Sequence, residues 1–472
     1  MNRKIAFGFW LMAFGFLPAA AQRVLSLDSC RQMALRNNKQ LSISKMKQDV
    51  AANERKSART KFLPHVNALG TYVHTTKEVS ILNDNQKFAL SNVGTGLVSQ
   101  IPAPIQEKLA GLQTALNALG QDVVDAFRTD TRDMFAGTIA LTQPIFMGGS
   151  IIAFNKIADI KERIAANSLD ASIQSTLYTI DQAYWQVVSL HHKKQLAQSY
   201  LDLVKKLDVD VRKMIDEGVA TKSDGLSVDV KVNEAEMTLT KVNDGLVLSR
   251  MLLNQLCGLP LDEQVTLADE LAENIAVVEI SAKPDVEMAV ANRPELKLLE
   301  NTVALSKQAT NVLKAGNLPQ VALTGGYLIS NPNVFNGFEK KFSGMWNVGV
   351  SVRVPIWNWG DVMYKVRASK GTTAIVNLEL ADAREKIELQ VNQTAFKVEE
   401  ANKKLAMAQS NIQRADENLR MANLGFREGV ITPTTVMEAQ TAWLQAQSQK
   451  IDAEIDVKLS QVDLQKALGT LE

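Results

Sequence analysis

The side chains best suited to catalysis or metal binding are few and dispersed. No histidine or cysteine in the chain stands at the spacing of a metal site or a catalytic triad. The adjacent His191 and His192 would project in different directions from a helix, and the other two histidines are His65 and His74. The sequence has no phosphate-binding loop and no nucleophile elbow. We therefore expect no enzyme activity, no cofactor and no metal site.

The two cysteines, Cys30 and Cys257, leave two interpretations open. In an oxidising compartment they could form a disulfide, but nothing in the sequence places them side by side. They could equally be two small buried side chains. A lipid anchor at Cys30 is disfavoured, because Asp28 lies just before it and the apolar N-terminal run ends far upstream.

Composition and the N-terminus indicate an exported, helix-rich chain. The net charge is +1, from 52 basic and 51 acidic residues, so no strong field would gather nucleic acid. Residues 1–21 are typical of a signal peptide, with a basic start, an apolar run of about 13 residues and a small-residue cleavage site. That run is too short to span about 30 Å of hydrocarbon, and no later stretch is long and apolar enough. Any membrane-spanning part of the mature chain would have to consist of strands.

The chain repeats itself at two fixed offsets. At an offset of 255 residues, the matching positions are Ala34, Asn37, Leu41, Leu63, Pro64, Gly70 and Tyr72 with Ala289, Asn292, Leu296, Leu318, Pro319, Gly325 and Tyr327. At an offset of 211, they include Pro144, Gly149, Gly218, Thr221 and Gly258 with Pro355, Gly360, Gly429, Thr432 and Gly469. The offsets differ because the first copy carries 44 extra residues (255 minus 211) between its two strands. The prediction is therefore repeat 1 at 22–258, a linker at 259–284 and repeat 2 at 285–472.

Each copy is expected to begin with a helical stretch, at about 31–61 and about 286–316, that Leu-Pro closes. Two segments that alternate between apolar and polar residues follow in each copy. Even positions from Trp346 to Val354 are apolar and odd ones are polar or small, the pattern of a strand with two unlike faces. The four expected strands are 64–75, 136–145, 319–330 and 345–355. Four strands make a poor soluble sandwich, and they cannot close a membrane barrel, since the smallest use about eight. Closure would need several chains.

Aromatic residues lie at the ends of the expected strands. They are Tyr72, Phe146, Tyr327, Trp346, Trp357 and Trp359. This placement is typical of an aromatic girdle at a membrane interface, and ordinary core packing is the alternative.

Two very long helices are predicted at 150–216 and 361–428, each about 100 Å long at 1.5 Å per residue. The second carries a heptad seam at Leu405, Ala408, Ile412, Ala415, Leu419, Ala422 and Phe426. Shifted by 211, the seam holds in the first copy except at Lys194 and Asp208. Helices at 222–257 and 433–469 would fold back as partners after Glu-Gly-Val-x-Thr turns, in which glycine suits a positive φ.

This order of elements resembles the TolC-like outer-membrane efflux family over essentially the whole mature chain. The resemblance rests on Leu-Pro before each first strand, Pro-Ile-Phe-Met-Gly-Gly at 144–149, Pro-Ile-Trp-Asn-Trp-Gly at 355–360, and the two turns at 217–221 and 428–432. It implies a mainly α fold with a membrane β-barrel: a homotrimer with a 12-stranded barrel in the outer membrane, continuous with a periplasmic α-helical coiled-coil barrel. It also implies a passive conduit with a periplasmic adaptor and an inner-membrane pump as partners. The implied docking residues are Gly218, Val219, Thr221, Gly429, Val430 and Thr432.

The resemblance further implies an acidic constriction near the turn of the second copy, where this sequence departs from the pattern. Arg420 and Asn423 stand where acidic residues would be expected. Asp416, Glu417 and Asp208 are the substitute candidates, with Arg420 beside them. For each of these residues the alternative is a solvated helix face.

A connection of about 60 residues (74–135) in the first copy is a second departure. Ile105, Leu109, Leu112, Leu116, Leu119, Val123 and Phe127 predict an amphipathic helix within it. We expect this helix outside the cell, packed at the barrel mouth against neighbouring chains or over the pore; the alternative is an insert that packs only on its own loop. The rival function for the whole chain is a periplasmic structural coiled coil without a channel, which would leave the alternating strands unexplained.

Overall fold

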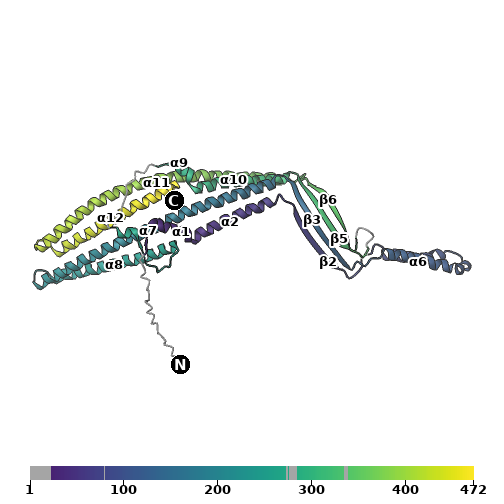
Figure 1. The fold of residues 1–472 in the computed structure, drawn as a ribbon, viewed down its shortest axis with the longest axis horizontal. Coiled ribbons are helices and arrows are strands. Elements are labelled where there is room, and N and C mark those ends of the chain that lie inside the picture. The colour runs from purple at the N-terminus through teal and green to yellow at the C-terminus, as the bar shows by residue number, and fades with distance from the viewer. Residues whose placement is uncertain (1–22, 79, 273–274, 276–283, 334–338, 472) are drawn as a thin grey trace, which may run out of the picture. The chain divides into compact units, whose positions relative to one another are not determined.

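The computed structural model describes residues 23–471 except 79, 273–274, 276–283 and 334–338 (Figure 1). The expected signal peptide at 1–21 lies outside the described residues. The chain divides into two compact units, each built from both halves of the sequence. One comprises Met1–Ala51, Lys161–Val303 and Ala374–Glu472, and the other Ala52–Ile160 and Ala304–Thr373. No helix in the described ranges combines the length and apolar character needed to cross a membrane.

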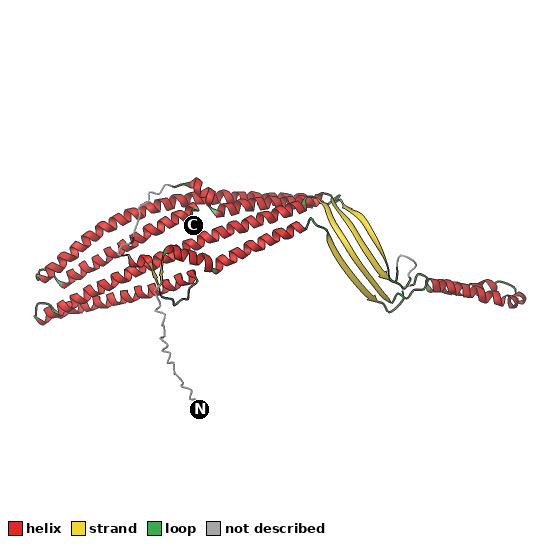
Figure 2. Ribbon diagram, in the orientation of Figure 1, coloured by secondary structure: helices red, strands yellow, loops and turns green. Residues whose placement is uncertain are grey.

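The second unit contains a four-stranded antiparallel sheet (Figure 2). Its strands are β2 (His65–His74), β3 (Asp133–Met147), β5 (Gln320–Asn331) and β6 (Ser343–Arg353), in the order β2-β3-β5-β6. His65 lies opposite Thr142 in the first hairpin, and Gln320 lies opposite Arg353 in the second. These pairs are related by the sequence offsets of 255 and 211, so both hairpins have the same register.

The sheet is exposed on both faces in the single chain. Every residue of β2 is exposed, and so is every residue of β6 after its first position. The apolar face of β6 therefore stands open, with Trp346 75% and Val350 62% exposed. Within the part of the chain that the structure describes, β2 and β6 each pair along one edge only. Unpaired strand edges are ready templates for further strands.

Helical segments of the same unit connect to the strands of this sheet. Helix α2 (Lys39–Thr60) leads to β2, and α10 (Pro294–Lys314) leads through the short η3 (Ala315–Asn317) to β5. The Asn155 side chain of α7 (Ser150–Asp216) donates to the Ala58 carbonyl of α2 at 3.1 Å. Hydroxyl pairs such as Thr310 with Ser369 (2.7 Å) join α10 to α11 (Asp361–Arg427). In both copies, therefore, the helix before the first strand packs on the helix that follows the second strand.

The connection between β2 and β3 is a helical insert. It contains α3 (Asp84–Ser91), α4 (Val93–Val98), α5 (Ala103–Gln106), η1 (Glu107–Leu109) and α6 (Ala110–Ala126). The single helix expected at 105–127 is wrong in detail, because the chain changes to a 3-10 turn at 107–109 before α6 begins. Gly94 and Gly120 allow close packing of α6 on α4 and α3: a Cβ at Gly120 would lie 1.8 Å from the Leu90 carbonyl oxygen. The insert packs on its own connection, and contact with other chains stays a prediction.

Two long hairpins make up most of the first unit. Helices α7 (Ser150–Asp216) and α11 (Asp361–Arg427) have 67 residues each, and α8 (Lys222–Cys257) and α12 (Pro433–Leu468) have 36 each. The heptad seam of α11 is buried at Leu405, Leu419 and Phe426. In one core, Val204 and Val211 of α7 pack with Val228 of α8 and Val436 of α12, so the two hairpins share a core.

A compact region closes the other end of these hairpins. Here β1 (Arg23–Leu25) pairs in parallel with β4 (Val265–Leu267), which leads into η2 (Ala268–Leu271). Helix α1 (Leu27–Asn37) is joined to α7 by Arg31, whose Nε and Nη2 donate to the buried Asp181 carboxylate at 2.8 and 2.6 Å. In the second copy α9 (Val286–Asn292) takes the place of α1 and packs on α12.

Two expectations about these elements need correction. The sequence predicted four strands, but the described chain has six, because β1 and β4 have three residues each and are too short to show an alternating pattern. The helical stretches expected at 31–61 and 286–316 are each broken in two. The breaks fall at Asn38, which has an extended conformation, and at Arg293, just before Pro294.

Candidate functional site

The two hairpin tips have the same backbone geometry. Gly218 has a φ of +76° and Gly429 a φ of +72°, the left-handed conformation that ends a helix. The Val219 amide donates to the Met214 carbonyl at 2.8 Å, and the Val430 amide donates to the Gly425 carbonyl at 2.9 Å. These donors and acceptors are again 211 residues apart. Both turns therefore present a valine at the tip, 66% exposed at 219 and 79% at 430.

The tips differ in how the second helix begins. Thr221 accepts the Asp224 amide at 3.2 Å, and the Asp224 carboxylate accepts the Thr221 amide at 2.9 Å, which forms a capping box. The hydrogen bonds from Thr221 lower the pKa of Asp224. In the second tip Thr432 accepts the Thr435 amide at 3.4 Å. Only the first tip has a carboxylate at this cap, and so the two tips differ in charge.

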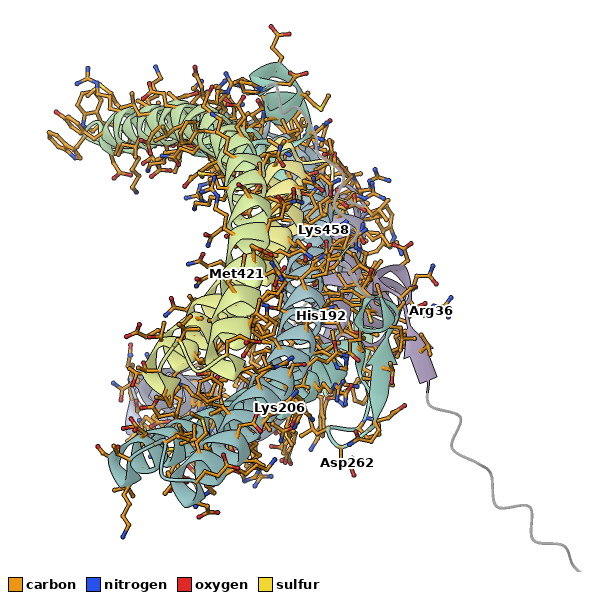
Figure 3. All side chains as sticks on the ribbon, turned by 90° about the vertical axis from the view of Figure 1, so that its left-hand side faces the viewer. Arg36, His192, Lys206, Asp262, Met421 and Lys458 are labelled. Atoms are coloured by element: carbon orange, nitrogen blue, oxygen red, sulfur yellow. The ribbon has the colours of Figure 1, made fainter. Side chains whose placement is uncertain are left out.

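A groove lies between the two hairpins near the tips. It has a volume of about 610 Å³ and runs between α8 and α12. Its lining includes Val230, Lys231, Glu234, Met437, Glu438 and Thr441. The groove thus combines apolar side chains with side chains of both charges. Figure 3 views the helices from the end where the tips lie.

The constriction candidates occupy two helices. Asp416, Glu417 and Arg420 lie on α11, and Asp208 lies on α7. Arg420 donates two hydrogen bonds to the Glu417 carboxylate at 2.7 and 2.8 Å, which lowers the pKa of Glu417 and raises that of Arg420. The structure thus brings Glu417 and Arg420 together. Both side chains are exposed, so solvent screens the attraction between their charges.

The other two carboxylates have partners that sequence reasoning missed. Asp208 accepts from Arg212 at 2.9 Å, and Arg212 also contacts Asp229 of α8. The bond with Asp208 is the main cause that raises the pKa of Arg212. Asp416 accepts from the indole nitrogen of Trp443 at 2.7 Å. The i, i+4 spacing of Asp208 and Arg212 was a usable signal, whereas the contact of Asp416 with Trp443 depends on how α11 and α12 pair.

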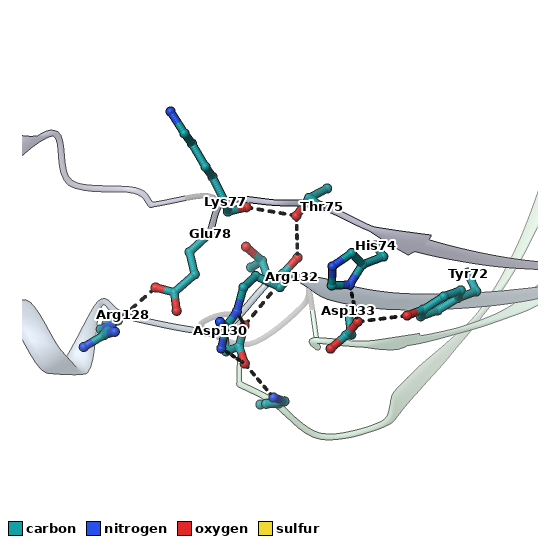
Figure 4. A network of polar contacts seen from close by, with 11 residues as sticks. Tyr72, His74, Thr75, Lys77, Glu78, Arg128, Asp130, Arg132 and Asp133 are labelled. Carbon is teal, nitrogen blue, oxygen red and sulfur yellow. Dashed lines mark hydrogen bonds and ion pairs between the residues drawn. The ribbon is translucent and has the colours of Figure 1, made fainter.

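A polar network closes the base of the insert (Figure 4). Asp133 accepts from the Tyr72 hydroxyl at 2.9 Å and lies 2.7 Å from the His74 ring. Beside it, Asp130 binds Arg132 and Lys340, each at 2.8 Å, which lowers the pKa of Asp130. The network ties the insert to both strand hairpins.

The aromatic residues at the strand ends are largely exposed. Tyr72 is 56% and Tyr327 47% exposed, and Tyr72 packs on Phe135 with ring centroids 4.8 Å apart. Trp357 and Trp359, after β6, are 74% and 85% exposed and meet edge to face. Core packing within the single chain therefore does not account for them, and a membrane-interface girdle stays a prediction.

Three of the four histidines have polar neighbours in the structure. His74 lies beside Asp133, His191 lies 3.8 Å from Glu270, and buried His192 lies 3.3 Å from the Asp269 carbonyl oxygen. Among the residues that the structure describes, no three His, Cys, Asp or Glu side chains gather as metal ligands would.

The model of a known protein family, described as outer membrane efflux protein, matches residues 30–259 and 286–470. The chain belongs to this family. It is a TolC-like protein of the outer membrane that extends into the periplasm, in a family of transport conduits rather than enzymes.

Curated relatives and solved structures agree with this assignment. The outer membrane protein TolC of Vibrio cholerae is 21% identical over 351 residues, which cover 72% of this chain and 77% of the relative. The alkaline protease secretion protein AprF of Pseudomonas aeruginosa is 20% identical over 402 residues, covering 79% and 82%. The fold is similar to the CusC channel (TM-score 0.73, 15% identity, 94% of this chain and 92% of that one) and to the open MtrE channel of Neisseria gonorrhoeae (TM-score 0.71, 16% identity, 94% and 89%).

Proposed function

We propose that three copies of this chain form a passive export conduit that docks a periplasmic adaptor and, through it, an inner-membrane pump. The observation that carries the proposal is the open four-stranded sheet, whose edge strands β2 and β6 are paired on one side only among the residues that the structure describes. In a bilayer, unpaired backbone groups at such edges would each cost several kcal/mol. Pairing β6 of one chain with β2 of the next removes the edges, and three chains give twelve strands. Fewer strands than about eight would not close.

The pairing of β3 with β5 provides the template for this contact. It joins the second strand of the first copy to the first strand of the second copy, with Ile139 opposite Tyr327. A β6–β2 contact between chains would join the same two kinds of strand. Adding 211 to Ile139 and subtracting 255 from Tyr327 gives Val350 opposite Tyr72 of the next chain. Both residues are exposed in the single chain, at 62% and 56%.

Cysteine cross-linking tests this arrangement. A chain with Val350→Cys and Tyr72→Cys, oxidised in the native membrane, should give a ladder of covalent species that ends at three chains. The matched controls pair Tyr72→Cys with Ser351→Cys, which points to the other face, and with Val352→Cys, which is displaced by two residues. Cross-linking that is stronger in either control would contradict the register. A ladder that ends at another number, or a monomer in every variant, would contradict the trimer, and a monomer outside the membrane would favour the structural coiled coil.

The hairpin tips support the docking part of the proposal. Exposed Val219 and Val430, held by equivalent turns, would offer an adaptor two similar contact points from each chain. The groove between α8 and α12 could receive a helix of that adaptor, with apolar anchors such as Val230 and Met437 and charges at the rim. The sequence has no phosphate-binding loop, so the free energy of export would come from the pump.

A further inference from the structure

The fold brings the only two cysteines of the sequence into contact. Cys30 lies on α1, and Cys257 is the last residue of α8. Both are fully buried in one core, and the Cys257 Sγ lies 3.9 Å from the Cys30 carbonyl oxygen. The closeness of the two side chains raises the pKa of Cys30 and lowers that of Cys257. Two residues 227 positions apart thus have adjoining side chains.

The surrounding backbone fixes this approach independently of the sulfur atoms. The Asn37 side chain, at the end of α1, donates to the Cys257 carbonyl at 3.0 Å. Gly258 follows with a φ of +74°, and a Cβ at this position would lie only 2.5 Å from the Asn37 Cβ. Glycine therefore lets α1 reach the end of α8. The cysteines are held next to each other by contacts on either side of them.

The equivalent junction of the second copy lacks both thiols. Offsets of 255 and 211 place Asp285 and Leu468 where the first copy has Cys30 and Cys257. There α9 packs on α12, Leu468 joins an apolar core, and Arg293 donates to the Lys466 carbonyl at 2.9 Å. The junction can thus close without cysteine. The first copy thus differs from the second at both positions of this contact, and a covalent link needs a cysteine at both.

We propose that Cys30 and Cys257 form a disulfide in the mature protein, which links α1 to the end of α8. The chain extends into the periplasm, an oxidising compartment where disulfides persist. The oxidant would be the active-site disulfide of a periplasmic thiol oxidoreductase. One cysteine thiolate attacks that disulfide and forms a mixed disulfide. The other thiolate then displaces the enzyme sulfur, so that two protons leave the cysteines and two electrons reduce the enzyme.

Burial sets the time at which the bond forms. Neither thiol is accessible in the folded chain, so the oxidoreductase has to act before α1 covers the end of α8. Once formed, the bond is shielded from reductants by the same core. The native protein should therefore resist mild reductants until it is unfolded.

Thiol counting in the full-length protein tests the proposal. Membranes are quenched with acid, denatured, and treated with a maleimide-linked polyethylene glycol with or without prior reduction. The wild type should gain no adduct without the reductant and two adducts with it, and the intact unreduced protein should be lighter by two hydrogen atoms. Cys30→Ser and Cys257→Ser should each gain one adduct under both conditions, which calibrates the assay.

Two results would overturn the proposal. Two adducts without reductant would show that the cysteines remain thiols in the membrane. A cross-linked species that separates into single chains on reduction would show pairing between chains instead. The count is made on denatured protein, so it does not depend on whether the serine variants fold well.

Discussion

Gly148 and Gly149, which join β3 to α7, provide a quantitative test of the backbone geometry. Both have a positive φ, +64° and +84°. A left-handed conformation costs a residue with a Cβ about 1–2 kcal/mol. At Gly148 an added Cβ would also lie 2.7 Å from the Ala315 carbonyl oxygen and 3.0 Å from the Leu318 Cβ, while nothing lies within 4 Å of a Cβ at Gly149. Overpacking of this kind costs a further 1–3 kcal/mol or so.

We therefore expect Gly148→Ala to destabilise the protein by about 2–5 kcal/mol, and Gly149→Ala by about 1–2 kcal/mol. The second copy provides a natural comparison, because Trp359 stands at the position equivalent to Gly148 with a φ of +52°. Its side chain is 85% exposed and meets no such clash. Trp359→Gly should be nearly neutral: it relieves about 1–2 kcal/mol of strain but loses the ring contact with Trp357, worth about 0.5–1.5 kcal/mol, and adds backbone freedom to the unfolded chain.

Thermal unfolding of the purified protein in detergent, followed by circular dichroism, gives the order of the midpoints. Gly148→Ala should melt lowest, Gly149→Ala next, and Trp359→Gly close to the wild type. Equal losses for the two glycine variants would refute the argument from the Ala315 contact. A large loss in Trp359→Gly would show that the exposed tryptophan contributes more than its strain costs.

Two further predictions concern the proposed conduit. The double variant Val219→Arg with Val430→Arg should abolish export in cells while the cross-linked trimer still forms, because a buried, unpaired charge would oppose docking of the adaptor. The control is Leu226→Arg, which changes an exposed apolar residue on α8. Unchanged export in the double variant would count against docking of the adaptor at the tips. Replacing Asp416, Glu417 and Asp208 with amides should lower cation block and cation preference of single channels in a planar bilayer. In the wild type, the lowered pKa of Glu417 should keep its negative charge to a lower pH than that of an ordinary glutamate; unchanged conductance would remove these residues from the constriction.

Sequence periodicity predicted the structure best in long segments with one apolar and one polar face. The alternation that begins at Trp346 lies on β6 as far as Arg353, and five of the seven seam residues from Leu405 to Phe426 are buried on α11. The seam arises because one face of α11 packs while the other stays exposed over many residues, and for β6 the proposed trimer in the membrane would provide the two unlike environments. Strands β1 and β4 have only three residues each, too few to show an alternating pattern. Their parallel pairing joins segments about 240 residues apart, so no local sequence pattern predicted it.

The residues of the candidate site were predictable to different degrees. The turns at Gly218 and Gly429 were predictable because left-handed backbone selects glycine at a fixed place after a helix. The partner of Asp208 was predictable from helical spacing. The partner of Asp416 was not, since Trp443 reaches it only through the pairing of α11 with α12. The meeting of Cys30 with Cys257 likewise depends on how α1 packs against α8.

The two copies agree in backbone and differ in side chains, and this difference matters for a conduit. Equivalent glycines have nearly equal φ values: +84° and +80° at Gly149 and Gly360, +74° and +70° at Gly258 and Gly469. The proposed trimer would therefore repeat its helical hairpins six times around the pore. Its charges would repeat only three times, because Lys205 and Lys206 occupy the positions equivalent to Asp416 and Glu417. Any of these side chains that face the pore of the proposed trimer would therefore alternate in sign around it.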